Sequence, residues 1–270
     1  MKTFNVRVWF LFFVTTAVMA LIVQLFVLPV LFPALHAGHG LVVGGDWVGF
    51  HQIAQELAEK IRSEGWSAWS LRAGASSPAD IAALVYAVSV SEPYALIPLN
   101  AAVHASAGLI LVAILRPIVD DRMIAFLAAV PFVIFPGAAT WYAQIHRDGY
   151  YILGMLLFCY GWVRIVASTG CDQRWWQPSL ALIFSVFGGA VLVWVARPYA
   201  LHLLFYASLL LAFFVMSLIF WKALKLRAFS KQAIVELLSI ILVVGSMHLI
   251  IGGAWLMTWM VKCVTGVLLH

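Results

Sequence analysis

The chain has 270 residues, of which 64% are hydrophobic and only 10% carry a charge. A soluble domain carries about 25% charged residues, and a large core does not explain so deep a deficit. Composition therefore excludes a soluble globular protein and predicts an all-α, polytopic membrane protein. The formal net charge of +5 comes from basic residues spread between apolar segments, which is typical of topology signals. No nucleic-acid partner is expected.

Seven apolar segments are long enough to cross a bilayer, which takes about 20 residues. They are residues 8–33, 94–115, 123–143, 150–168, 178–196, 199–221 and 234–261. The first is longer than the ~7–15 apolar residues of a signal peptide and is predicted to be a retained transmembrane helix. Pro131 and Pro136 are expected to kink the third span. Because neither a linker nor a repeat is visible, residues 1–270 are predicted to form one transmembrane domain.

Basic residues predict the orientation of these spans. With the N-terminus inside, cytoplasmic segments hold ten of the 16 Lys and Arg residues, and the densest group lies between Lys222 and Lys231. The positive-inside rule then places the N-terminus in the cytoplasm. Residues 36–92, the long polar segment after the first span, lie outside on this topology.

Two juxtamembrane helices are predicted within residues 36–92. Residues 47–64 have the pattern of an amphipathic helix lying along the outer membrane surface. Its apolar face is predicted to comprise Val48, Ile53, Leu57 and Ile61. A second, shorter helix is predicted over 78–91, because Ser77 followed by Pro78 is a good start signal.

The outward ends of the spans carry a small set of charged and imidazole groups. Charged groups at a membrane boundary are candidates for a functional site. In chain order the candidates are Asp46, His51, His146, Arg147, Asp148, Arg197 and His202.

Each candidate also has a structural interpretation. Asp46 is equally suited to capping the helix at 47–64. Arg147 and Asp148 are compatible with a surface ion pair, and Asp148 with a helix cap. Arg197 is compatible with snorkelling at a helix end. A single histidine in an apolar helix, such as His202, is more often a hydrogen-bonded structural residue.

Together the outward groups suit one kind of chemistry. Arginine binds phosphate through a planar fork, and a lone aspartate deprotonates a hydroxyl as a general base. The combination fits displacement of a lipid phosphate from a sugar carbon. The phosphate would lie at the membrane surface, with its isoprenoid tail between helices.

The order of these features resembles the conserved module of GT-C membrane glycosyltransferases, near the aminoarabinose transferases and protein O-mannosyltransferases. The likeness rests on an Asp followed by an aromatic residue and His, two juxtamembrane helices, a Pro-Leu-Asn-Ala helix from Pro98 to Ala101, and a Pro-rich helix ending in an Arg-Asp turn. Residues 135–154 are similar to the segment where many relatives carry a basic-acidic pair. The resemblance covers about residues 1–165, and Asp46 matches the family's first-loop catalytic Asp.

The resemblance implies an inverting glycosyltransferase at the outer face of the cytoplasmic membrane. It would move a sugar from a polyprenyl-phosphate donor to an envelope acceptor, which is a glycan, a lipid or a protein. Asp46 would be the general base. Asp148 would orient Arg147, assist catalysis, or join Asp46 in binding a divalent ion such as Mg²⁺ or Mn²⁺. The substrate-binding candidates are His51, His146, Arg147, Arg197 and His202, with the two arginines on the donor phosphate and His51 shaping the acceptor site.

One departure from the family keeps alternatives open. Most relatives continue with more spans or a large outer domain, whereas this chain has about seven spans. A minimal enzyme, one that needs a membrane partner subunit, and an inactive homologue all fit. A transporter or flippase of a lipid-linked sugar and a non-catalytic subunit of a polysaccharide assembly complex are the rival functions. Catalysis or lipid-sugar binding is favoured if Asp46, Asp148 and Arg197 line one outward cavity.

Overall fold

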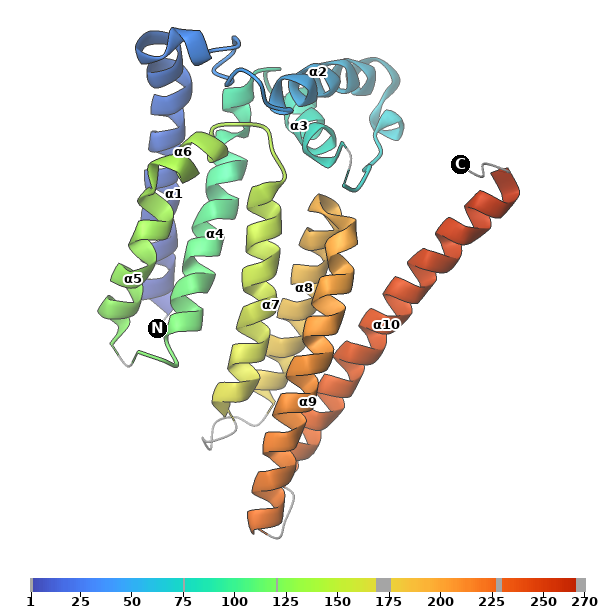
Figure 1. Cartoon of the computed structure of the whole chain (residues 1–270). Helices are drawn as coiled ribbons and strands as arrows, with labels where there is room; N and C mark the ends of the chain where they lie inside the picture. Colours follow the sequence, from blue (N-terminus) through green and yellow to red (C-terminus); the bar gives the residue numbers. More distant parts are fainter. Residues whose placement is uncertain (1, 75, 120, 169–175, 227–229, 266–270) are drawn as a thin grey trace. The chain divides into compact units, whose positions relative to one another are not determined.

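The computed structural model describes residues 2–74, 76–119, 121–168, 176–226 and 230–265. These residues form helices and connecting loops, with no β-strand among them (Figure 1). The α-helices are α1 (Lys2–Ile22), α2 (Trp47–Glu64), α3 (Ser77–Val88), α4 (Ile97–Leu115), α5 (Arg122–Ile134), α6 (Pro136–Tyr142), α7 (Asp148–Ser168), α8 (Gln177–Ala196), α9 (Leu201–Leu226) and α10 (Lys231–Thr265). Shorter π or 3₁₀ turns are η1 (Val23–Leu31), η2 (Pro33–Leu35), η3 (Trp66–Ala68), η4 (Pro93–Leu96) and η5 (Pro198–Ala200).

The spans have the length and composition that a membrane requires. Among the described residues, six helices are long and apolar enough to cross, and the bent pair α5 and α6 makes a seventh if it counts as one span. Large apolar side chains such as Leu210 and Phe213 are 73% and 74% exposed, which suits contact with lipid tails. The predicted all-α, polytopic fold is confirmed, and the chain is a multi-pass membrane protein.

The third span breaks at Pro136, one of the two prolines at which a kink was predicted, whereas Pro131 lies inside the continuous helix α5. The axes of α5 and α6 differ by 61°, and Phe135 between them has an extended backbone, with φ −61° and ψ 126°. Proline disfavours helical geometry in the residue before it. It also has no N–H to donate, so Pro136 leaves the carbonyl of Phe132 without its helical partner. The chain turns at Phe135 for this reason.

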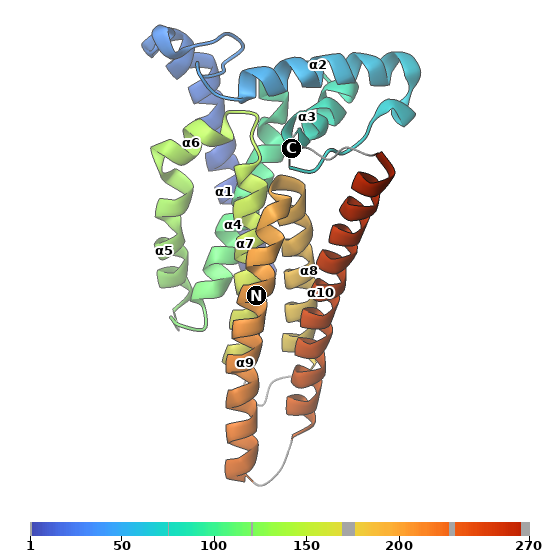
Figure 2. The ribbon, with the colours of Figure 1, turned by 45° about the vertical axis from the view of Figure 1, so that its right-hand side comes forward.

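Helices α2 and α3 pack on each other as a separate layer, and η4 connects α3 to the start of α4 (Figures 1 and 2). The bounds of α2 are those predicted, and α3 ends three residues earlier than expected. The buried face of α2 consists of His51, Ala54, Ala58 and Ile61. Of the predicted apolar face only Ile61 is fully buried, because small alanines allow close approach to α3 while the larger side chains stay partly buried at the rim.

Two arginines fasten this layer. The guanidinium of Arg72 donates to Asp80 of α3 at 2.5 Å, and the backbone N–H of Arg72 donates to the same carboxylate at 2.7 Å. The Asp80 side chain is fully buried. The second arginine, Arg62, donates to carbonyls at the end of α3, including that of Ser89 at 3.4 Å. The Arg62 contacts satisfy helix-end carbonyls that lack intrahelical partners.

By contact density the chain divides into two compact units. The first comprises Met1–Leu157 with Val191–Pro198, and the second comprises Phe158–Ala190 with Tyr199–His270. The prediction of one domain over residues 1–270 stays a prediction.

In the second unit α9 and α10 are in contact and run in opposite directions (Figure 2). A buried carboxylate lies on α10. Ser168 and Gln232 each donate a hydrogen bond of 2.8 Å to Glu236, which is 2% exposed. These bonds satisfy a carboxylate that would otherwise be costly to bury.

Candidate functional site

An ion pair joins two of the predicted site residues. The guanidinium of Arg197, directly after α8, donates to the carboxylate of Asp148, the first residue of α7, at 2.6 Å. The two side chains are 33% and 32% exposed, so solvent and solutes reach both. The Arg197 guanidinium also lies over the ring of Tyr151, 5.3 Å from its centroid. The predicted interpretation of Arg147 and Asp148 as a mutual pair is replaced by this longer-range pair.

Arg147 instead holds the loop between α2 and α3, which contains Gly74. Its guanidinium donates to the carbonyl of Gly74, while the N–H of Gly74 donates to the carbonyl of Val195 at 3.0 Å. Gly74 has φ +82°, and a Cβ there would lie 2.6 Å from Pro198, so only glycine fits. Arg147 retains several N–H donors and can contact a ligand as well.

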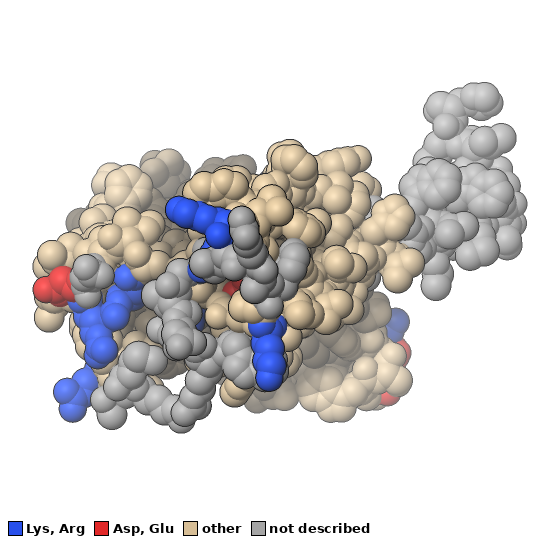
Figure 3. All heavy atoms as spheres, turned by 90° about the horizontal axis from the view of Figure 1, so that it is seen from below, with Lys and Arg blue, Asp and Glu red and all other residues tan. Residues whose placement is uncertain are grey.

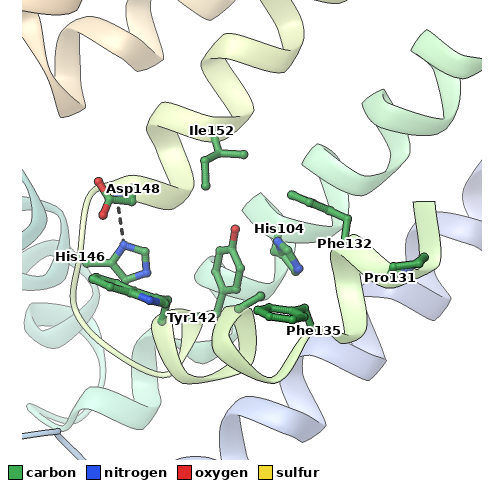
Figure 4. A pocket seen from close by; sticks show the side chains of 10 residues that line it. His104, Pro131, Phe132, Phe135, Tyr142, His146, Asp148 and Ile152 are labelled. Atoms are coloured by element: carbon green, nitrogen blue, oxygen red, sulfur yellow. Dashed lines mark hydrogen bonds between the residues drawn. The ribbon is translucent and has the colours of Figure 1, made fainter. Parts of the chain in front are cut away.

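His146 is held in a defined tautomer. Its Nδ1 accepts a hydrogen bond of 3.0 Å from the backbone N–H of Asp148 (Figure 4). Burial lowers the pKa of His146 to about 4, against the opposing influence of Asp148. The ring is therefore neutral at physiological pH, and its proton resides on Nε2 as a hydrogen-bond donor.

An apolar pocket of about 400 Å³ lies beside these residues. It is formed by α4, α5, α6 and the start of α7, next to the break at Phe135 (Figure 4). Its lining comprises His104, Pro131, Phe132, Phe135, Ala138, Trp141, Tyr142, His146, Asp148 and Ile152. Asp148 thus both borders the pocket and pairs with Arg197.

Three amide side chains fix the loops around the pocket. Gln144 accepts from the N–H of Val42 at 3.0 Å and donates to the carbonyl of Gly40 at 3.3 Å. Asn100 donates to the carbonyls at either end of the turn after α6, at 3.0 and 3.2 Å. Gln24 donates to the carbonyl of Ala143. Sequence reasoning missed these residues, although a polar amide within an apolar span was a usable signal.

Asp46 occupies the N-cap position of α2 but does not cap it. Among the described residues its side chain accepts no hydrogen bond from the first turn of α2, and Asp46 is exposed. The next residue, Trp47, meets the ring of Trp141 edge-on at 5.6 Å between centroids, and Trp141 lines the pocket. Asp46 therefore lies one residue from a side chain that touches the pocket wall, rather than in the lining itself.

The remaining two candidates, His51 and His202, are not among the residues that line the pocket. His51 is 4% exposed, and its Nδ1 is 2.9 Å from the hydroxyl of Tyr86 in the contact between α2 and α3. His202 belongs to the second unit, where it is exposed and its Nδ1 is 3.3 Å from the carbonyl of Tyr199. His51 has the environment of a packing residue.

Acid is expected to loosen the α2–α3 layer through His51. Burial lowers the pKa of His51, the nearby His39 lowers it further, and Glu92 opposes them. An unfolded histidine binds its proton near pH 6.5, so between that pH and the lower folded pKa the unfolded state holds more protons. The contribution of neutral His51 to the stability of the layer is therefore complete above about pH 6.5. It is lost as the pH falls from there through the lower folded pKa.

Amide hydrogen exchange of α2 in nanodiscs would check this expectation. After correction for intrinsic rates, exchange should quicken between about pH 7.5 and about pH 5. His51→Gln should flatten the dependence, whereas His202→Gln should not. Wild-type exchange that is independent of pH would contradict the expectation.

The predicted metal site concerns two carboxylates, those of Asp46 and Asp148. Within the described ranges no group of three or more His, Cys, Asp or Glu side chains could hold an ion. Arg197 already neutralises Asp148. The predicted divalent-ion site on Asp46 and Asp148 stays a prediction, and the proposed reaction includes no metal step.

The fold and the pocket define a class, a multi-pass all-α membrane protein with an aromatic pocket bordered by an ion pair. No family model, no curated protein and no solved structure matches the chain.

Proposed function

We propose that the chain is a glycosyltransferase that takes a sugar from a polyprenyl-phosphate donor. The observation that carries the proposal is the position of Asp148, which borders an aromatic pocket and also pairs with Arg197. A lipid-linked sugar phosphate has an anionic centre next to an organic ring, and the site offers a cation next to an apolar cavity. The resemblance to GT-C enzymes points to the same substrate class.

In this reaction Arg197 holds the donor phosphate. Its fork binds two phosphate oxygens, and Asp148 keeps the guanidinium at the pocket mouth. Arg147 supplies a second cation beside it. Both arginines favour departure of the phosphate, because the negative charge on it grows as the sugar–oxygen bond breaks.

Asp46 serves as general base. Its exposed carboxylate, unused as a cap, removes the proton from an acceptor hydroxyl, which attacks the anomeric carbon opposite the phosphate. The carbon–oxygen bond to phosphate breaks, and polyprenyl phosphate leaves with the electron pair. The result is inversion at that carbon. The acceptor is an envelope glycan, lipid or protein.

We place the site at the outer face of the cytoplasmic membrane. Support comes from charge. The face of the molecule seen in Figure 3 displays Lys and Arg side chains with few Asp or Glu. Cytoplasmic loops carry such an excess of basic residues.

Donor binding tests the proposal. Wild-type protein in nanodiscs should bind polyprenyl phosphate and consume its sugar-linked form. Arg197→Gln should weaken binding of polyprenyl phosphate by about 10- to 100-fold, because a hydrogen bond to a charged group contributes ~1.5–3 kcal/mol. Lys225→Gln, which removes one charge from the last turn of α9, is the matched control and should bind normally. Equal affinity in Arg197→Gln and wild type would refute the assigned phosphate site.

A further inference from the structure

The pocket has the walls of a ligand site rather than of a packing defect. Its volume of about 400 Å³ is at the lower end of the ~300–1,000 Å³ typical of small-molecule sites. The aromatic rings of Phe132, Phe135, Trp141 and Tyr142 line it (Figure 4). Such walls suit one flat or ring-shaped group.

A buried histidine faces this cavity without a normal partner. His104 of α4 is 1% exposed and lines the pocket. Its ring lies 3.8 Å from the ring of Tyr142 and 4.7 Å from that of Phe132, centroid to centroid. Within the part of the chain that the structure describes, neither ring nitrogen makes a hydrogen bond of normal geometry. The backbone carbonyls of Phe132 and Val133 lie near the ring without meeting that geometry.

An imidazole in this state implies a polar atom in the ligand. Leaving a buried donor or acceptor unsatisfied costs about 1–3 kcal/mol, and the nearby carbonyls can offset that cost only at the ring N–H of His104, not at its acceptor nitrogen. A ligand hydroxyl or carbonyl at the deep end of the pocket would remove that cost. A hydrocarbon chain would preserve it.

Three further polar side chains line the pocket together with His104. The hydroxyl of Tyr142 points into the pocket (Figure 4). His146 presents a protonated Nε2, since its Nδ1 already accepts from the N–H of Asp148. The third is Asp148, which pairs with Arg197. The pocket therefore combines aromatic faces with a few spaced hydrogen-bonding groups, the pattern that specific small-molecule sites use.

We propose that this pocket receives the sugar ring of the donor and that the isoprenoid tail lies elsewhere. A sugar has an apolar C–H face to pack on Tyr142 and Trp141, and hydroxyls to bond His104 and His146. With the phosphate on Arg197, the anomeric carbon lies at the mouth beside Asp148. The volume fits a single monosaccharide. This assignment rests on the proposed function.

Comparing polyprenyl phosphate with its sugar-bearing forms separates the sugar pocket from the phosphate site. Affinities of nanodisc-embedded protein are measured for polyprenyl phosphate and for polyprenyl phosphates bearing a hexose, a pentose or an amino sugar. In wild type at least one sugar-bearing lipid should bind more tightly than polyprenyl phosphate. His104→Phe should remove about tenfold of that extra affinity while polyprenyl phosphate binds as before. His104→Gln, whose amide can bond a hydroxyl, should restore part of it.

Controls distinguish recognition from loss of structure. His248→Phe changes an exposed histidine of α10 and should alter neither affinity. The midpoint of thermal unfolding should not fall in His104→Phe, because the unsatisfied imidazole is removed. If no sugar adds affinity, or if His104→Phe weakens both lipids equally, the sugar pocket is wrong while the phosphate site stands. If wild type binds neither lipid, the proposed function fails with it.

Discussion

Asp46→Asn is expected to lower the rate of sugar transfer by about 10²–10⁴-fold, the usual contribution of a general base. The amide has nearly the same shape but cannot accept the proton of the acceptor hydroxyl. Because the Asp46 side chain does not cap α2 in the described structure, the substitution should leave the unfolding midpoint unchanged. Release of polyprenyl phosphate from a sugar-linked donor, followed over time in nanodiscs, measures the effect.

One companion variant and one binding measurement make the result specific. Glu59→Gln removes an exposed carboxylate from the same helix and should keep the full rate. Asp46→Asn should also retain wild-type affinity for polyprenyl phosphate, since the phosphate is assigned to Arg197. Full transfer activity in Asp46→Asn would end the assignment of Asp46 as the base.

Arg72→Ala is expected to destabilise the α2–α3 layer by about 2 kcal/mol. Removing one partner of a buried pair costs ~3–5 kcal/mol, but two features reduce that value here. Arg72 is half-exposed, and its backbone N–H continues to bond Asp80. Unfolding of the purified protein in mixed micelles with rising SDS would report the change in free energy.

The neighbouring surface pair provides the control. Lys60 and Glu64 are 3.9 Å apart and more than half exposed, and such pairs contribute under ~1 kcal/mol. Lys60→Ala should therefore shift the transition much less than Arg72→Ala. Equal shifts for the two variants would show that burial of the Asp80 carboxylate does not control the stability of this layer.

Several residues of the candidate site could be predicted from the sequence. The charged turns at Asp148 and Arg197 stand out because charge is scarce in this chain, and both belong to the ion pair. Asp46 stood out for the same reason, but its side chain turned out not to cap α2. His104 and Gln144 were not identified as site residues. Nothing in the local pattern tells which single polar residue of an apolar helix faces a cavity.

The sequence by itself determined the spans, the amphipathic bounds of α2 and the break at Pro136. These features follow from local chemistry, namely apolar length, helical periodicity and the missing N–H of proline. Only the tertiary structure decided that Asp148 pairs with Arg197, 49 residues away, and that His104 faces the pocket. Such pairings depend on how each helix is rotated about its axis and on which neighbour it contacts. In a helix that is apolar on every side, the sequence periodicity gives little information about that rotation.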